Sequence, residues 1–273
     1  MERAAPFSPA QTIQEVIDRL ETIIQWCEEH NSRLGYFPVL YQSVTKAVQQ
    51  GIVRGRFEDG PRMERLDVIF ANRYLEAWHL HRQGERPTEV WQIAFQQGEK
   101  RKMTVLHHLF LGINAHINLD LGISAAATSP GDQLPDLEGD FREINRLLAE
   151  MVDGVQTKLG ELSSIMRWLD RAVGRLDERM AELSLKVARK NAWRVAKRFA
   201  AGTSEQYPQL LQEEDQRAAI GGRLLSQPGW KGRLFIWLLQ LGEKRLSPHQ
   251  VIDMLHESTH ATMRGFEFAP PRD

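Results

Sequence analysis

The feature that most constrains the fold is an apolar run that also carries histidine, asparagine and aspartate. Residues 105–123 read VLHHLFLGINAHINLDLGI, and no lysine, arginine or glutamate occurs from Met103 to Leu137. A surface helix keeps its polar residues on one outward stripe. At about 100° per residue, the polar residues of this run instead fall on two separate sides. One side carries His107, Asn114 and Asn118, and the other carries His108, His116 and Asp120.

A helix with this pattern has no face suited to water, so we expect the helix at about 103–121 to be buried. A buried polar group without a partner costs about 1–3 kcal/mol. The imidazole, amide and carboxylate groups of this run therefore need partners from the protein, from water, from a metal or from a ligand. The sequence thus places any candidate site on this helix.

The rest of the chain also has the periodicity of helices, and no segment alternates as a strand does. We therefore predict an all-α fold, a multi-helix bundle around the buried central helix at about 103–121. The 273 residues suit one helical domain. A division into two packed subdomains, 10–127 and 136–265, joined by the loop 128–135, stays open. The tail, 266–273, is expected to be disordered.

Composition excludes several classes of protein. The net charge of −1 lacks the basic excess of a general nucleic-acid binder. Cys27 is the single cysteine, so no disulfide can form within the chain. No uncharged apolar stretch reaches the roughly 18 residues of a membrane span, and the N-terminal residues lack the apolar core of a signal peptide. A cytoplasmic location is the expectation by default.

His116 and Asp120 lie four residues apart and therefore point to one place on the helix. Such a pair serves as two ligands of a divalent metal or as an imidazole oriented by a carboxylate. His108 lies too far along the axis to join them on one ion. Additional ligands for a metal are available on the C-terminal helix. They are Asp253, His256, Glu257 and His260.

Two other segments contribute candidate residues. The segment from Arg65 reads RLDVIFANRYLEAW, and its Asp67, Arg73 and Tyr74 are candidates for contact with the central helix. Arg189 lies at the border of the apolar side of a basic helix, where a guanidinium can hold an anion or a carboxylate. For all of these residues, a structural role within the bundle is the alternative interpretation.

Several segments together resemble a known family. They are GYFPVLYQSVTKAV, RLDVIFANRYLEAW, HHLFLGINAHINLDL and VARKNAWRVAKRFA. The resemblance is to the DUF5995 family, whose members are bacterial and fungal proteins of unknown function, and it covers about residues 10–260. It implies an all-helical fold and adds no established activity.

Two classes of function stay open. In the first, the protein is an enzyme that performs acid–base or metal-assisted chemistry on a small, partly apolar substrate. His116, Asp120 and His108 would then be catalytic, and Asn114, Asn118, His107, Arg73, Tyr74, Asp67 and Arg189 would bind the ligand. In the second, the same groups satisfy one another, and the protein binds a small molecule or lipid without catalysis or is purely structural.

Overall fold

The structure is a computed structural model, and it describes residues 6–100, 103–144, 146–147, 187–188, 190–226 and 246–267, without the side chains of 258–267. All regular structure in these residues is helical, which confirms the all-α prediction. The longer helices are α1 (Ile13–Glu29), α2 (Tyr36–Val53), α3 (Gly60–Arg82), α4 (Glu89–Gly98), α5 (Val105–Ala115), α6 (Leu121–Thr128), α9 (Tyr207–Ser226) and α11 (Pro248–Glu267). A further helical segment covers residues 190–201.

The helix beginnings follow from local hydrogen bonds. At the start of α1, the Thr12 hydroxyl accepts a hydrogen bond from the Glu15 amide, and at the start of α3 the Asp59 carboxylate accepts one from Arg62. These side chains satisfy amides that the first turn of a helix leaves without a partner. Asp59 is therefore the cap at which α3 begins, and Pro61 fits its first turn.

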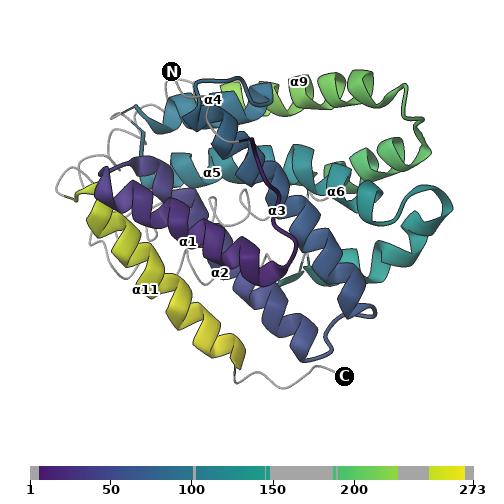
Figure 1. The fold of residues 1–273 in the computed structure, drawn as a ribbon, viewed down its shortest axis with the longest axis horizontal. Helices are drawn as coiled ribbons and strands as arrows, with labels where there is room; N and C mark the ends of the chain where they lie inside the picture. Colours follow the sequence, from purple (N-terminus) through teal and green to yellow (C-terminus); the bar gives the residue numbers. More distant parts are fainter. Residues whose placement is uncertain are drawn as a thin grey trace, which may run out of the picture.

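The central helix is surrounded by the others, as predicted. α5 packs against α2, α4 and α9, while α6 packs against α3. In Figure 1, α9 lies along one edge of the molecule, and α11 lies beside α1 and α2 at another edge. The helical run Val105–Thr128 is long and apolar enough to cross a membrane, but 83% of its apolar 18-residue stretch is buried inside the protein. It therefore has the burial of a core helix.

A π-helical turn, η2 (His116–Asp120), joins α5 to α6, so the helical run continues to Thr128 and not to 121. The Leu121 amide donates to the His116 carbonyl, five residues back along the chain. One residue is thus added to the turn, and the side chains that follow are rotated relative to those of α5. π turns of this kind occur often at functional sites.

The predicted loop at 128–135 has more structure than expected. Residues Gly131–Leu137 form a 3₁₀ helix, η3, which packs against α6. Leu134 and Leu137 are buried there. Burial of these two leucines holds the segment against the core.

Gly112 allows a close approach of Phe37, on α2, to the backbone of α5. A Cβ atom at this position would lie 2.3 Å from Cδ2 of Phe37, well inside van der Waals contact. The Phe37 ring consequently rests on the backbone of α5, one turn before His116. Glycine at 112 therefore fixes the position of a ring that also contacts His116.

Replacing Gly112 by alanine should destabilise the protein by about 1–3 kcal/mol, because the new methyl group forces the Phe37 ring to move in a packed core. The measurement is the free energy of unfolding in urea. Gly222→Ala is the control, since its new methyl group would meet its nearest atom at 3.3 Å, and helix propensity favours alanine. Equal stabilities of Gly112→Ala and the unmodified protein would contradict the proposed contact.

Candidate functional site

Asp120 lies at the centre of the site and is completely buried. Its Oδ1 atom accepts a hydrogen bond of 2.6 Å from Nε of Arg73, on α3. Its Oδ2 atom accepts one of 2.8 Å from the indole of Trp91, on α4, and lies 3.3 Å from Nδ1 of His116. Burial alone would raise the pKa of Asp120, but the charge of Arg73 and these hydrogen bonds lower it below its usual value. Asp120 is therefore an ionised carboxylate with both oxygens occupied.

The contact with Asp120 fixes the state of the His116 ring. Burial lowers the pKa of His116 more than Asp120 raises it, so the imidazole is neutral near pH 7. A neutral ring that faces a carboxylate through Nδ1 carries its proton on Nδ1. Its Nε2 atom is buried and has no hydrogen-bond partner among the residues that the structure describes. A lone pair is therefore available on Nε2.

Aromatic rings form the walls around His116. Phe70 stacks on the imidazole with a centroid distance of 3.5 Å, and the ring of Tyr41 lies at 4.4 Å. Phe37 and Trp91 contribute edges at 5.8 and 6.0 Å. These rings exclude water and leave few polar partners for the groups among them.

Among the described residues, three other buried polar atoms on this side of the central helix have no hydrogen-bond partner. They are the hydroxyl groups of Tyr41 and Tyr74, whose rings contact His116, and the Oδ2 atom of Asp67. The Tyr41 and Tyr74 rings are 6.0 Å apart, and, in addition to burial, the carboxyl groups of Asp67 and Asp120 both help to raise the pKa of Tyr41. Burial raises the pKa of Asp67 to about 8, with a smaller contribution from Glu64. Asp67 is thus a protonated, neutral acid near pH 7, unlike Asp120.

His108 lies apart from the His116–Asp120 pair, against Tyr36. It lines a cavity of about 20 Å³ together with Arg33, Phe37, Tyr74, Trp91 and Gly112. Burial, with the nearby charge of Arg33, lowers the pKa of His108 to about 3, so its ring is neutral. The cavity has room for about one water molecule. Phe37, Tyr74 and Trp91 line this cavity, and their rings also contact His116.

Asn114 and Asn118 do not join this group. The Asn114 amide donates to the Ala218 carbonyl of α9, and the Asn118 amide donates to the side chain of Asn114. Asn191, on the helical segment 190–201, donates to the Oδ1 atom of Asn118. Both predicted ligand-binding amides thus lie in a closed set of hydrogen bonds that holds α9 and residues 190–201 against the central helix.

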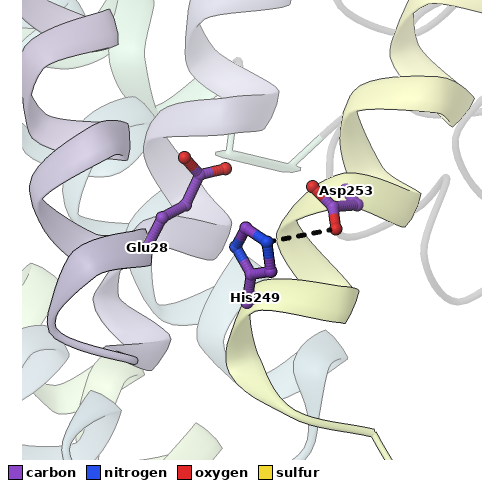
Figure 2. Close-up of side chains that lie close together, drawn as sticks. All are labelled: Glu28, His249 and Asp253. Carbon is purple, nitrogen blue, oxygen red and sulfur yellow. Dashed lines mark ion pairs between the residues drawn. The ribbon is translucent and has the colours of Figure 1, made fainter.

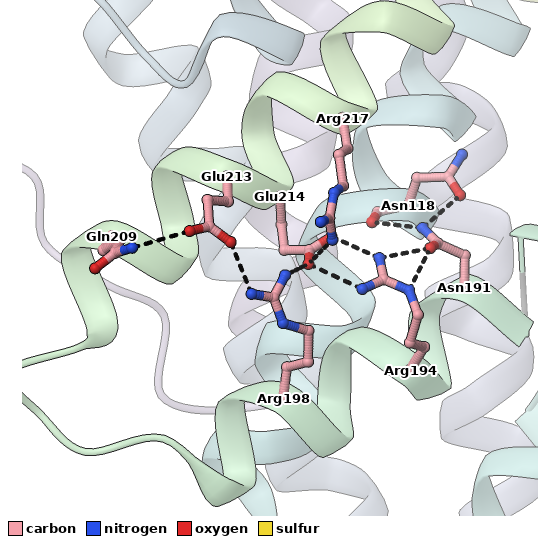
Figure 3. Close-up of polar contacts among 8 residues, drawn as sticks. All are labelled: Asn118, Asn191, Arg194, Arg198, Gln209, Glu213, Glu214 and Arg217. Carbon is pink, nitrogen blue, oxygen red and sulfur yellow. Dashed lines mark hydrogen bonds and ion pairs between the residues drawn. The ribbon is translucent and has the colours of Figure 1, made fainter.

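Figure 3 shows how this set continues to a cluster of arginines around a buried glutamate. Arg194 donates to Asn191 and also pairs with Glu214 at 2.6 Å. Arg198 and Arg217 pair with the same carboxylate. Burial would raise the pKa of Glu214, but its hydrogen bonds to Arg194 and Arg198 lower it. These contacts satisfy the polar groups on this side of the bundle.

The other residues predicted for the site lie away from the His116–Asp120 pair or outside the described residues. His107 is half-buried, and its Nδ1 atom lies 2.7 Å from the Thr104 hydroxyl at the start of α5. Arg189 lies outside the described residues. Of the metal ligands suggested on α11, the side chain of His260 lies outside the described residues, and the others are displaced from the pair because α11 packs against α1 and α2. Asp253 lies beside His249 and Glu28, so it is not a ligand for His116 and Asp120.

The donor set does not favour a metal at His116 and Asp120. Among the described residues, no third histidine, cysteine or carboxylate joins them at the spacing of metal ligands. The Asp120 carboxylate is already neutralised by the guanidinium of Arg73, which would repel a divalent cation. The geometry is that of an oriented histidine.

Sequence reasoning missed the residues that complete the site. Trp91 donates to Asp120, and Phe37, Tyr41 and Phe70 surround His116. Each has the spacing of an ordinary core residue, so the sequence offers no signal that separates it from the rest of the core. Of the predicted residues, Arg73, Tyr74, His116 and Asp120 do come together, and Asp67 lies close enough to Tyr41 to affect its pKa.

Residues 13–228 match the sequence model of a family described as "Family of unknown function (DUF5995)". The chain belongs to the DUF5995 family. No curated protein and no solved structure matches the chain. The resemblance expected from the sequence is thereby confirmed, and the DUF5995 match ends before α11.

The raised pKa of Asp67 predicts how stability depends on pH. Unfolded, the carboxyl group ionises near pH 4; folded, it stays protonated up to about pH 8. Between these values the folded state binds more protons, so its stability falls as pH rises, by up to about 1.4 kcal/mol per pH unit.

Asp67→Asn removes this titration and keeps the shape of the side chain. Urea unfolding of both proteins at pH 5, 6, 7 and 8 should show the variant gaining stability relative to the unmodified protein at each step. The titrations of His108 and His116 cancel in the comparison, because both proteins contain them. A difference that stays constant from pH 5 to 8 would mean that Asp67 is ionised in the folded protein.

Proposed function

We propose that this DUF5995 protein is an enzyme that moves a proton on a small, largely apolar substrate, with His116 as the general base. The observation that supports the proposal is the unpartnered Nε2 atom of a buried histidine whose other nitrogen faces an ionised carboxylate. Asp120 orients the ring and would stabilise the imidazolium once Nε2 has taken a proton. Arg73 and Trp91 hold Asp120 in place for this role.

The neutral acids beside His116 suggest the type of reaction. The hydroxyl groups of Tyr41 and Tyr74 and the protonated Asp67 are hydrogen-bond donors in a water-poor, aromatic environment. Neutral donors in an apolar site stabilise an oxyanion more effectively than they would in water. Asp67 is protonated and Asp120 is ionised, so one carboxyl group can donate a hydrogen bond while the other supports the base His116.

We infer that the reaction is proton abstraction next to a carbonyl group. The C–H bond breaks, its proton passes to Nε2 of His116, and the electron pair moves to the carbonyl oxygen, which the neutral donors hold as an enolate. Return of the proton from His116 to the same carbon would complete an exchange, and in a substrate with a β,γ double bond its return to the γ-carbon, with shift of that double bond, would complete an isomerisation. This sequence requires no additional oxidant or reductant.

The aromatic side chains around His116 indicate which kind of substrate would fit. Phe37, Tyr41, Phe70 and Trp91 offer ring faces and edges and no charge. A ligand would therefore be apolar apart from its carbonyl group. The cavity beside His108 is lined by Phe37, Tyr74 and Trp91, whose rings also contact His116, so a substrate that entered through this cavity would have to displace at least one of them.

A non-catalytic role is the second candidate, and one observation favours it. The cavity of about 20 Å³ is small, and the amides of Asn114 and Asn118 are fully engaged with other residues. A protein that only binds a small apolar molecule, or that uses these groups for structure, would share these features. It would differ in the state of His116, because catalysis needs a free lone pair on Nε2.

Nitrogen NMR of ¹⁵N-histidine-labelled protein at pH 7 should show the His116 proton on Nδ1 and an unprotonated Nε2. Asp120→Asn should remove this preference, since an amide can accept or donate at the ring. If the unmodified protein carries the proton on Nε2, His116 cannot act as the proposed base.

Exchange of α-protons for deuterium in cyclohexanone and 2-decanone tests the reaction directly. We expect the protein to accelerate exchange of at least one of these ketones, and His116→Gln to reduce the rate roughly 100-fold or more. The control is His107→Gln, on the same helix, which should retain the rate. If the unmodified protein and His116→Gln exchange both ketones equally, the proposed enolisation is incorrect.

A further inference from the structure

A second group of chemically active side chains lies far from Asp120 along the chain, where α11 meets the end of α1. Glu28 comes from α1, while His249 and Asp253 lie four residues apart on α11. Each offers one ligand atom, and these atoms all lie within 4.8 Å of one another. Figure 2 shows the imidazole of His249 between the two carboxylates, with its Nε2 atom 3.7 Å from Oδ2 of Asp253.

These distances suit a divalent ion after a small movement. Metal–ligand bonds of about 2.0–2.2 Å place neighbouring donors roughly 3.0–3.5 Å apart. The side chains of His249 and Asp253 are more than half exposed, so rotations about their side-chain bonds can close the gap without disturbing the core. Exposure also leaves water free to complete the coordination.

The backbone that holds the three residues is closely packed. A Cβ atom at Gly35 would lie 2.6 Å from Cδ1 of Ile252 and 2.8 Å from Cβ of Cys27. Only glycine allows this approach, and Ile252 and Cys27 are direct neighbours of Asp253 and Glu28. The two helices are therefore held at a fixed separation next to the three ligands, and the ligands do not depend on a loop for their position.

The charges around Glu28 also favour a cation. The charges that act on Glu28 include the carboxylates of Asp253 and Glu21. Three carboxylates around one imidazole leave a local excess of negative charge, which attracts a cation.

We infer that Glu28, His249 and Asp253 form a binding site for a first-row divalent transition metal such as Zn²⁺, which ties α11 to α1. One nitrogen and two oxygen ligands, with water in the remaining positions, match the chemistry of such ions. Glu28 lies within the residues that match the DUF5995 model, whereas His249 and Asp253 lie outside them, so two of the three ligands come from a part of the chain that this model does not cover. It is independent of the chemistry proposed for His116.

Isothermal titration of untagged, chelator-treated protein with ZnCl₂ tests the site. We expect one ion to bind per chain, with a dissociation constant in the micromolar range. Glu28→Gln, His249→Ala and Asp253→Asn should each weaken binding roughly tenfold or more. Glu29→Gln is the matched control, because Glu29 is an exposed carboxylate one residue along α1, and it should bind as the unmodified protein does.

Two results would overturn the inference. One is the absence of Zn²⁺ binding to the unmodified protein in the micromolar range. The other is equal binding by His249→Ala and the unmodified protein, which would place the ion on other residues. A matching test with MgCl₂ should show much weaker binding, because magnesium prefers oxygen ligands to imidazole.

The tie between the helices has its own measurement. Zn²⁺ should slow amide hydrogen exchange in residues 251–257 of α11 in the unmodified protein and in Glu29→Gln, but not in His249→Ala. Exchange at α11 that Zn²⁺ leaves unchanged, in protein that binds the ion, would show that the metal does not tie α11 to α1.

Discussion

The burial of the Asp120 carboxylate is the constraint on which the arrangement of this protein depends. An ionised carboxylate is stable inside a protein only if other groups replace the water that it loses. Here Arg73 of α3, Trp91 of α4 and His116 of the central helix provide those groups. Removing one partner of a buried pair of charges costs about 3–5 kcal/mol. The positions of three helices are therefore linked through one side chain.

The two polar sides of the central helix have opposite chemistry, and the contrast supports a function for one of them. On the side of α9, the hydrogen bonds run from Asn114 through Asn118, Asn191 and Arg194 to Glu214. On the side of α3, the Tyr41 hydroxyl, Asp67 Oδ2, the Tyr74 hydroxyl and His116 Nε2 have no partner among the described residues. Each unpartnered group costs about 1–3 kcal/mol. A purely structural network would not require four such groups on one side of the helix.

The sequence predicts the burial of the central helix because the cause is local: no lysine, arginine or glutamate provides a surface for water from Met103 to Leu137. It also predicts that His116 and Asp120 face one place, since four residues make about one turn. It does not predict that Asn114 and Asn118 contact α9, or that Trp91 donates to Asp120, because those contacts depend on how distant helices pack. The π turn at His116–Asp120 likewise depends on packing, and no residue type in HINLD requires it.

Asp67 and Asp120 show why residue type alone could not assign the roles within the site. Both are completely or almost completely buried carboxyl groups. Asp120 contacts a guanidinium and an indole and is held ionised, whereas Asp67 has no cation among the groups that shift its pKa and is held neutral. The placement of one arginine thus helps to keep one of two identical side chains ionised, while the other stays protonated. Arg73 lies six residues after Asp67 on α3, and its guanidinium contacts the Asp120 carboxylate of the neighbouring helix.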